Sequence, residues 1–168
     1  MPLLIMWGLW ALDFVWPGRI GHGIVPRTAY GLPGIAMAPF LHGNLQHLLS
    51  NTVPFAILGA IILLRGTRAF TFVFITSMLF SGFGTWLFGT PGTEHIGASG
   101  VVFGFLGYVL LRAIYDRRFD SFVIAVLVAL LYGAMIVSSI LPASGISWTS
   151  HVFGFIGGVV AARLRYAR

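Results

Sequence analysis

Three short segments of the sequence contain the residue types needed for nucleophilic catalysis. Ser99 stands in a Gly-Ala-Ser-Gly run, His151 lies near the C-terminus, and His47 and Asn51 are four residues apart in an apolar stretch. A serine hydroxyl is a weak nucleophile unless a base accepts its proton, and a neutral imidazole is the usual base. Side-chain N–H groups, such as those of His47 and Asn51, can stabilise the oxyanion formed in amide hydrolysis. The pattern predicts acyl transfer with Ser99 as nucleophile and His151 as general base.

The composition indicates that these residues work in a membrane. Of 168 residues, 58% are hydrophobic and 8% are charged, whereas a soluble domain has about 25% charged residues. Because a span needs about 20 apolar residues, this length accommodates about six helices with short connections. The absence of cysteine excludes disulfides, thiolate metal sites and a cysteine nucleophile. Despite the net charge of +6, we expect a lipid bilayer as the surrounding and no nucleic acid as partner.

Six apolar segments predict an all-α polytopic membrane protein, a six-helix bundle formed by one domain over residues 1–168. They run over residues 3–16, 45–64, 69–88, 99–111, 121–141 and 148–164. A long connection rich in Gly and Pro separates the first two, and Pro54 falls in the second, where a membrane helix tolerates it. The first segment is short and carries Asp13. Since no basic stretch and cleavage site accompany it, we expect a retained helix rather than a signal peptide.

Arginine placement predicts the orientation in the membrane, because short loops rich in Arg stay in the cytoplasm. The ends of the second, fourth and sixth segments are rich in Arg, whereas the opposite loops contain only two. Both termini should then be cytoplasmic, and the active site should open to the extracytoplasmic side. All basic residues are Arg, which is typical of a GC-rich bacterial genome, so we expect the plasma membrane. The arginines at the ends of the second, fourth and sixth segments are Arg65, Arg68, Arg112, Arg117, Arg118, Arg163, Arg165 and Arg168. The two in the opposite loops are Arg19 and Arg27.

The candidate residues share one depth in this arrangement. Counting back from the Arg residues at the helix ends, at about 1.5 Å per residue, places Ser99, His151 and Asn51 roughly 20 Å above the cytoplasmic side. For about 30 Å of hydrocarbon, that depth is about 10 Å below the outer surface. Polar side chains at such a depth are costly unless they face a protein interior or water. The depth therefore predicts a polar pocket.

The same segments resemble the three signature segments of the rhomboid family. The resemblance rests on residues 42–51 (HGNLQHLLSN), on Gly-x-Ser-Gly at 97–100, and on His151 followed by Gly154 three residues later and by Gly158 four residues after that. Their order and spacing match, and the match covers nearly the whole chain. It implies an intramembrane serine endopeptidase whose substrates are transmembrane proteins.

The resemblance also implies a role for each matched side chain. Ser99 and His151 would form a catalytic dyad, and His47 and Asn51 would stabilise the oxyanion. Two features differ from the family pattern. The Trp-Arg pair that some members carry in the first loop is missing, and the aromatic residue one turn after the serine, often Tyr, is Phe103. Phe103 can still stack on the His151 ring.

Other interpretations of these residues stay open. His47 and Asn51 could bond across helices for packing alone. His42 could belong to the site or be a structural loop histidine, and we expect His22 and His95 to be ordinary loop residues. Taken alone, Ser99 could be only a helix N-cap, for which serine is favoured.

Glycines near the candidate dyad predict close helix packing. Gly97 and Gly100 flank the serine, which would let the loop turn and a substrate backbone approach. Gly100 also belongs to a small-residue stripe on the fourth segment, as Gly154 and Gly158 do on the sixth. Close approach of the two helices is what a bond between Ser99 and His151 requires.

Other chemistries lack their residues in this sequence. There is no His-Glu-x-x-His zinc motif, and Asp13 is the only carboxylate inside a predicted span, so neither metalloprotease nor paired-aspartate chemistry is expected. We expect no metal and no organic cofactor. Glu94, Asp116 and Asp120 should lie in loops, which predicts a mechanism without an acidic partner for the histidine. The remaining rivals are a catalytically silent rhomboid-fold protein that binds membrane clients and a small transporter.

Overall fold

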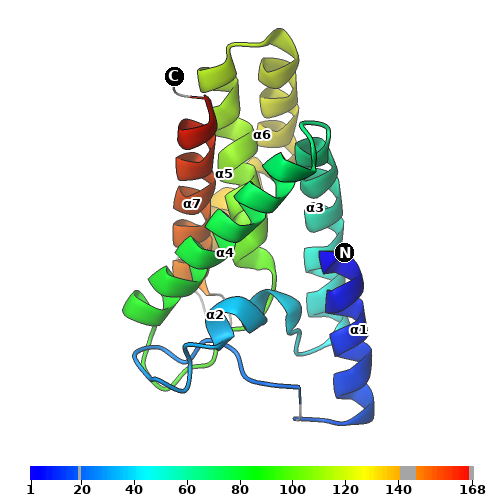
Figure 1. Ribbon diagram of the computed structural model, residues 1–168, viewed down its shortest axis with the longest axis vertical. Helices are drawn as coiled ribbons and strands as arrows, with labels where there is room; N and C mark the ends of the chain where they lie inside the picture. Colours follow the sequence, from blue (N-terminus) through cyan, green and yellow to red (C-terminus); the bar gives the residue numbers. More distant parts are fainter. Residues whose placement is uncertain (19, 141–146, 167–168) are drawn as a thin grey trace.

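The computed structural model of the protein describes residues 1–18, 20–140 and 147–166 (Figure 1). Within these ranges the chain is helical, and the all-α prediction is confirmed. Predictions that involve Arg19, Leu141 and Arg168 fall outside the described residues. The helices are α1 (Pro2–Val15), α2 (Gly34–Met37), the 3-10 helix η1 (Ala38–Phe40), α3 (Leu45–Leu63), α4 (Thr67–Phe88), α5 (Ser99–Asp116), α6 (Phe119–Ile140) and α7 (Trp148–Tyr166).

Helix α5 is longer than the sequence predicted, because Arg112 does not mark its end. The Arg112 side chain is buried, with 1% exposure, and its Nε lies 3.2 Å from an Asp116 carboxylate oxygen one turn further on. Ser121 at the start of α6 accepts a second bond from Arg112. A buried charge is tolerated when it is paired and hydrogen-bonded in this way. The helix ends at Asp116, and the next residue, Arg117, adopts the left-handed backbone conformation (φ +52°).

The long connection after α1 is not a simple loop. It contains α2 and η1, two short helices that the sequence analysis did not predict. Pro39 lies in the first turn of η1, where its missing N–H costs no hydrogen bond. Helix α2 packs on α4 so closely that a Cβ on Gly82 would lie 2.5 Å from Ile35. The connection therefore folds back onto the bundle and reaches the start of α3.

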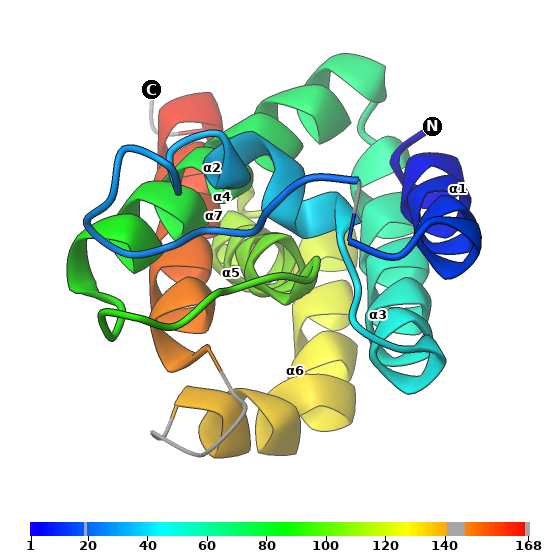
Figure 2. The same ribbon diagram turned by 90° about the horizontal axis from the view of Figure 1, so that it is seen from below.

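Helix α5 forms the centre of the bundle, with α3, α4, α6 and α7 around it (Figure 2). The apolar stretch of α5 is 61% buried, whereas that of α6 is 17% buried, which places α6 at the periphery. Among the described residues, α3, α4, α5 and α6 are long and apolar enough to cross a membrane, and α1 is a shorter apolar helix. The predicted count of six spanning helices is therefore approximate.

The direction of the helices gathers the candidate residues at one end. Helices α3, α5 and α7 run the same way, and α4 and α6 run the opposite way (Figure 1). The N-terminal ends of α3, α5 and α7 carry His47, Ser99 and His151, respectively. The other end carries the Arg-rich connections after α3 and α5. The chemistry-bearing residues and the arginines that follow α3 and α5 thus occupy opposite ends of the molecule.

Candidate active site

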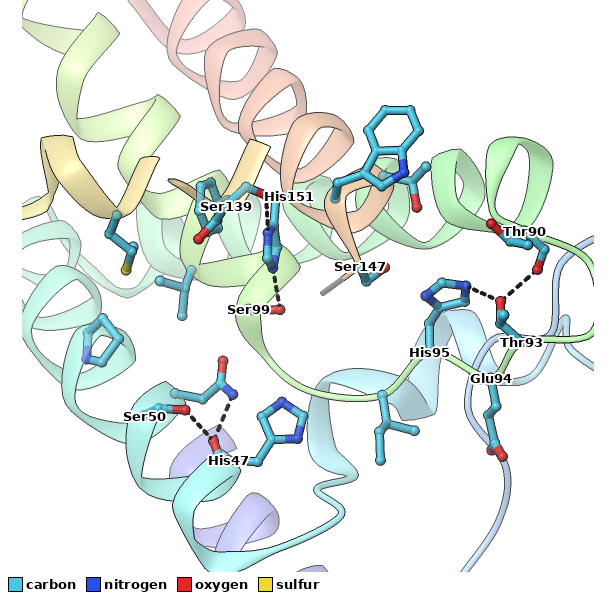
Figure 3. Close-up of a pocket in the computed structure, with 18 residues that line it drawn as sticks. His47, Ser50, Thr90, Thr93, Glu94, His95, Ser99, Ser139, Ser147 and His151 are labelled. Atoms are coloured by element: carbon cyan, nitrogen blue, oxygen red, sulfur yellow. Dashed lines mark hydrogen bonds between the residues drawn. The ribbon is translucent and has the colours of Figure 1, made fainter. Parts of the chain in front are cut away.

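Ser99 and His151 meet through a hydrogen bond. Ser99 is the first residue of α5, His151 lies in the first turn of α7, and the His151 Nε2 atom is 2.9 Å from Ser99 Oγ (Figure 3). The other ring nitrogen, Nδ1, is 2.9 Å from the backbone carbonyl oxygen of Ser139. A carbonyl only accepts hydrogen bonds, so Nδ1 carries the ring proton and Nε2 accepts the Ser99 hydroxyl proton. This is the tautomer that a general base requires.

Glycines allow the dyad helices to approach this closely. A Cβ on Gly154 would overlap the carbonyl oxygen of Gly100, and a Cβ on Gly158 would overlap that of Gly104. The backbones of α5 and α7 therefore touch directly below the Ser99–His151 hydrogen bond. The small-residue stripes expected from the sequence are in contact.

An aromatic ring fixes the plane of the histidine. The rings of Phe103 and His151 are stacked, with centroids 4.3 Å apart and an interplanar angle of 11°. Phe103 is 2% exposed and His151 is 6% exposed. The stacking predicted for Phe103 is present, and it restricts rotation about the Cβ–Cγ bond of His151 to the two orientations that keep the ring in this plane.

The loop before Ser99 is fastened to the connection that contains α2 and η1. Gly97 N–H donates to the Ala38 carbonyl at 2.8 Å, and His95 exchanges two backbone hydrogen bonds of 2.9 Å with Ile24. Gly97 has a φ of +110°, a conformation that residues with a side chain rarely adopt. The first connection thus acts as a scaffold that holds the nucleophile loop.

His42 contacts the loop that carries the nucleophile. Its Nε2 accepts a hydrogen bond of 3.4 Å from Ala98 N–H, the residue immediately before the nucleophile. Burial, and secondly the neighbouring His47, lowers the pKa of His42 to about 4, although the Phe40 carbonyl acts in the opposite direction. His42 is therefore neutral at pH 7, as an accepting nitrogen must be. The structural interpretation of this residue is the one that the contacts support.

His47 and Asn51 line the same cavity as Ser99. Asn44 caps α3 by accepting a hydrogen bond of 2.8 Å from His47 N–H, which fixes the first turn. The Asn51 amide donates one N–H to the His47 carbonyl at 2.9 Å, and its second N–H remains for another acceptor. A Cβ on Gly97 would lie 2.5 Å from the His47 ring, so a side chain at this position would displace the imidazole.

The cavity has a volume of about 930 Å³. The residues on its wall include Ser99, His151, Met135 and Ser139 of α6, and Trp148 of α7. Cavities of a few hundred to about 1,000 Å³ hold small ligands and short peptide segments. The polar pocket predicted from the common depth is therefore present.

Glu94 lines the cavity, but neither its carboxylate nor that of Asp13 is bonded to the dyad. Glu94 is exposed, and its carboxylate accepts a hydrogen bond from Gly23 N–H, away from Ser99 (Figure 3). Asp13 accepts one from Gly18 N–H. Both ring nitrogens of His151 are already occupied by uncharged oxygen atoms.

Two features of the site were missed by the sequence analysis. The Ser139 carbonyl is a backbone group, so no residue type signals it. The second is a hydrogen bond of 2.8 Å between the hydroxyls of Ser81 and Ser150, packed against Gly100. Ser81 is a polar residue inside the apolar sequence of α4, and this could have suggested a hydrogen bond to another helix.

Comparison with known proteins identifies the family. The family model described as Rhomboid domain matches residues 31–168. The chain belongs to the rhomboid family. Rhomboid proteins are in general serine proteases of membranes, and this rhomboid chain, whose described residues include four long apolar helices, is a membrane protein.

Several curated relatives resemble this rhomboid chain over most of its length. An uncharacterized protein of Mycobacterium tuberculosis is 38% identical over 85% of this chain and 63% of its own length. A protein of Acanthamoeba polyphaga mimivirus, named as a candidate rhomboid protein, is 34% identical over 72% of this chain and 68% of its own. A candidate rhomboid protease of Bacillus subtilis is 29% identical over 74% and 62%, respectively. The chain thus spans 63% of the length of its mycobacterial relative.

Proposed function

We propose that this rhomboid protein is an intramembrane serine endopeptidase that cleaves membrane-anchored proteins with a Ser99–His151 dyad. The observation that carries the proposal is the 2.9 Å contact between His151 Nε2 and Ser99 Oγ on the wall of a large cavity. A serine used only as a helix cap would bond to a backbone N–H of its own helix. Ser99 instead bonds to a histidine more than fifty residues away.

The reaction follows from the proton positions. As Ser99 Oγ attacks the carbonyl carbon of the scissile peptide bond, His151 Nε2 takes the hydroxyl proton. The resulting imidazolium then gives that proton to the amine nitrogen as the C–N bond breaks, leaving an ester on Ser99. A water molecule hydrolyses the ester with His151 again as base. The products are the two peptide fragments, and the dyad returns to its first state.

Three donors are available for the oxyanion. The His47 ring, the free N–H of the Asn51 amide and the backbone N–H of Ser99 at the start of α5 all belong to residues that line the cavity. The first N–H groups of a helix have no intrahelical partner and carry partial positive charge. Such groups lower the free energy of the tetrahedral intermediate because its negative charge develops on the former carbonyl oxygen.

We further propose that the protein lies in the plasma membrane, with both termini cytoplasmic and the cavity open to the extracytoplasmic side. The arginines at the end opposite Ser99 support this orientation. The absence of native cysteine makes a labelling test clean. Phe119→Cys, at a position 81% exposed, should label from the cytoplasm, and Pro91→Cys should label from outside. The reverse pattern would overturn the orientation without affecting the dyad.

The function itself is tested with a fluorophosphonate probe and a membrane-anchored reporter substrate. Wild type should label and cleave, and Ser99→Ala and His151→Ala should do neither. Ser138→Ala, which removes an exposed hydroxyl on α6, is the matched control and should behave like wild type. Cleavage by Ser99→Ala at the wild-type rate would refute the dyad. A wild type that binds the reporter but neither labels nor cleaves would favour a silent client-binding protein, and solute flux through reconstituted protein would favour a transporter.

A further inference from the structure

We propose that the backbone carbonyl of Ser139 is the positioning group for His151, in the role that a carboxylate has in soluble serine proteases. This inference rests on the proposed protease function. In soluble enzymes the acidic residue holds the imidazole in the correct tautomer and orientation and stabilises the imidazolium. Here the atom on Nδ1 is an uncharged main-chain oxygen from another helix.

Two contacts together leave the His151 ring a single orientation. Stacking on Phe103 fixes the plane of the imidazole. Two ring orientations in that plane are related by a half-turn about the Cβ–Cγ bond, and the 2.9 Å contact between Nδ1 and the Ser139 oxygen selects the one that aims Nε2 at Ser99. Because the carbonyl cannot donate, it also excludes the tautomer with a proton on Nε2, which could not act as a base.

The position of Ser139 in its helix explains why its carbonyl is available. Ser139 lies in the last turn of α6, which ends at Ile140. The last four carbonyls of a helix have no N–H partner within it. A free carbonyl at a helix end is therefore an acceptor that costs no helical hydrogen bond. It also avoids the large desolvation cost of burying an unpaired carboxylate beside the dyad.

The hydrogen bond to Ser139 connects His151 to α6, a helix that carries neither member of the dyad. Helix α6 contributes Met135 and Ser139 to the wall of the cavity, so a substrate there touches the same turn that orients His151. Movement of the outer end of α6 would withdraw the acceptor from Nδ1. Correct orientation of the base thus depends on how α6 packs against α7.

The test makes the Ser139 carbonyl a weaker hydrogen-bond acceptor without changing a side chain. Replacing Ile140 by its α-hydroxy acid converts the bond after Ser139 to an ester, whose carbonyl is a poorer acceptor. The matched control replaces Val137, a residue with 68% exposure, by its α-hydroxy acid, which alters the Ile136 carbonyl instead. Each change also removes one amide N–H of α6. The readouts are kcat, KM and the ring 15N resonances of His151 in detergent, assigned by their loss in His151→Ala.

We expect the wild-type spectrum to show neutral His151 with its proton on Nδ1. The ester after Ser139 should lower kcat about 3- to 10-fold with KM unchanged, as expected for weakening one hydrogen bond, and should populate the Nε2–H tautomer. The control ester should do neither. An Nε2–H tautomer in wild type would overturn the inference, and so would an ester variant indistinguishable from the control.

The tautomer of His151 is read from the spectrum without any turnover, so the contact with Ser139 and the protease function are tested independently. Should the ester variant fail to fold, the wild-type tautomer alone decides. Should wild type show the Nδ1–H tautomer but no cleavage and no probe labelling, the protease function fails while the assigned contact stands.

Discussion

The backbone of Gly154 in α7 rests on the carbonyl oxygen of Gly100 in α5, with no room for a methyl group between them. Ser99 precedes Gly100, and His151 lies one turn before Gly154. The contact that packs α5 against α7 therefore also brings Ser99 and His151 together. The 2.9 Å hydrogen bond of the dyad exists because two glycines let the helices touch.

We expect Gly154→Ala to lower turnover by about 100-fold or more. The added Cβ would meet backbone rather than a flexible side chain, so α5 and α7 must separate. A displacement of about 1 Å between reacting groups can cost about 100-fold. Reporter cleavage per mole of folded protein measures the effect.

The control is Gly133→Ala on α6, where a Cβ would meet nothing within 4 Å. In a helix interior this change should be neutral or stabilising by up to about 1 kcal/mol. Equal losses in Gly133→Ala and Gly154→Ala would show that the glycine contact is not what positions the dyad.

The sequence predicted this contact because helical rise and glycine periodicity are local properties. A rise of about 1.5 Å per residue places Ser99 and His151 at one depth, and glycines four apart predict a flat helix face. The end of α5 was predicted wrongly because an arginine in an apolar sequence can either mark the end of a span or be buried in an ion pair. Arg112 was taken as a boundary charge, whereas in the structure it is buried against Asp116. Only tertiary contacts distinguish these cases.

Removing either proposed oxyanion donor should reduce kcat more than it changes KM. His47→Ala and Asn51→Ala should each cost about 100- to 1,000-fold, the usual effect of losing one donor. The packing alternative makes a different prediction, because it would lower Tm in detergent while leaving kcat of the folded protein near wild type. Ser50→Ala, a neighbouring residue on the cavity wall whose hydroxyl bonds to the His47 carbonyl, is the matched control.

Acidification should destabilise the fold through His42. Its pKa is lowered to about 4 by burial, against about 6.5 in an unfolded chain, so the unfolded state binds the extra proton first. The stability contributed by neutral His42 is complete above pH 6.5 and is lost as the pH falls from about 6.5 to about 4. Unfolding in detergent, followed by Tm against pH, should show this loss.

The decline should become shallower in His42→Gln, which still offers an acceptor to Ala98 N–H but does not titrate in this range. Burial also lowers the pKa of His95, so part of the decline should remain. His22→Gln, at an exposed loop position, should keep the wild-type decline. An unchanged slope in His42→Gln would place the acid sensitivity elsewhere.

The loop that holds Ser99 lay beyond what the sequence could predict. Its hydrogen bonds to Ala38 and Ile24 join backbone groups, and main-chain donors leave no trace in residue types. The Ser139 carbonyl was missed for the same reason. The segment that contains His42 was recognised from the sequence, but the contact of its ring with Ala98 N–H was not, because the donor is a backbone group.

The last prediction is that no carboxylate takes part in catalysis. In soluble serine proteases, replacing the triad acid by its amide costs about 10,000-fold. Asp116 and Asp120 lie at the end of the bundle opposite Ser99, and Glu94 bonds to Gly23. Glu94→Gln, Asp13→Asn and Asp120→Asn should therefore keep kcat within about 10-fold of wild type.

Asp116→Asn separates stability from catalysis within this set. It leaves the buried guanidinium of Arg112 without its counter-charge, and breaking such a pair typically costs about 3–5 kcal/mol. Tm should fall strongly while kcat per folded molecule stays near wild type, because the ion pair lies a whole helix length from Ser99. The measurement is reporter cleavage normalised to folded protein, beside Tm for each variant. A 10,000-fold loss of kcat in any folded member of the series would mean that the histidine has an acidic partner after all, and that the Ser139 carbonyl does not replace it.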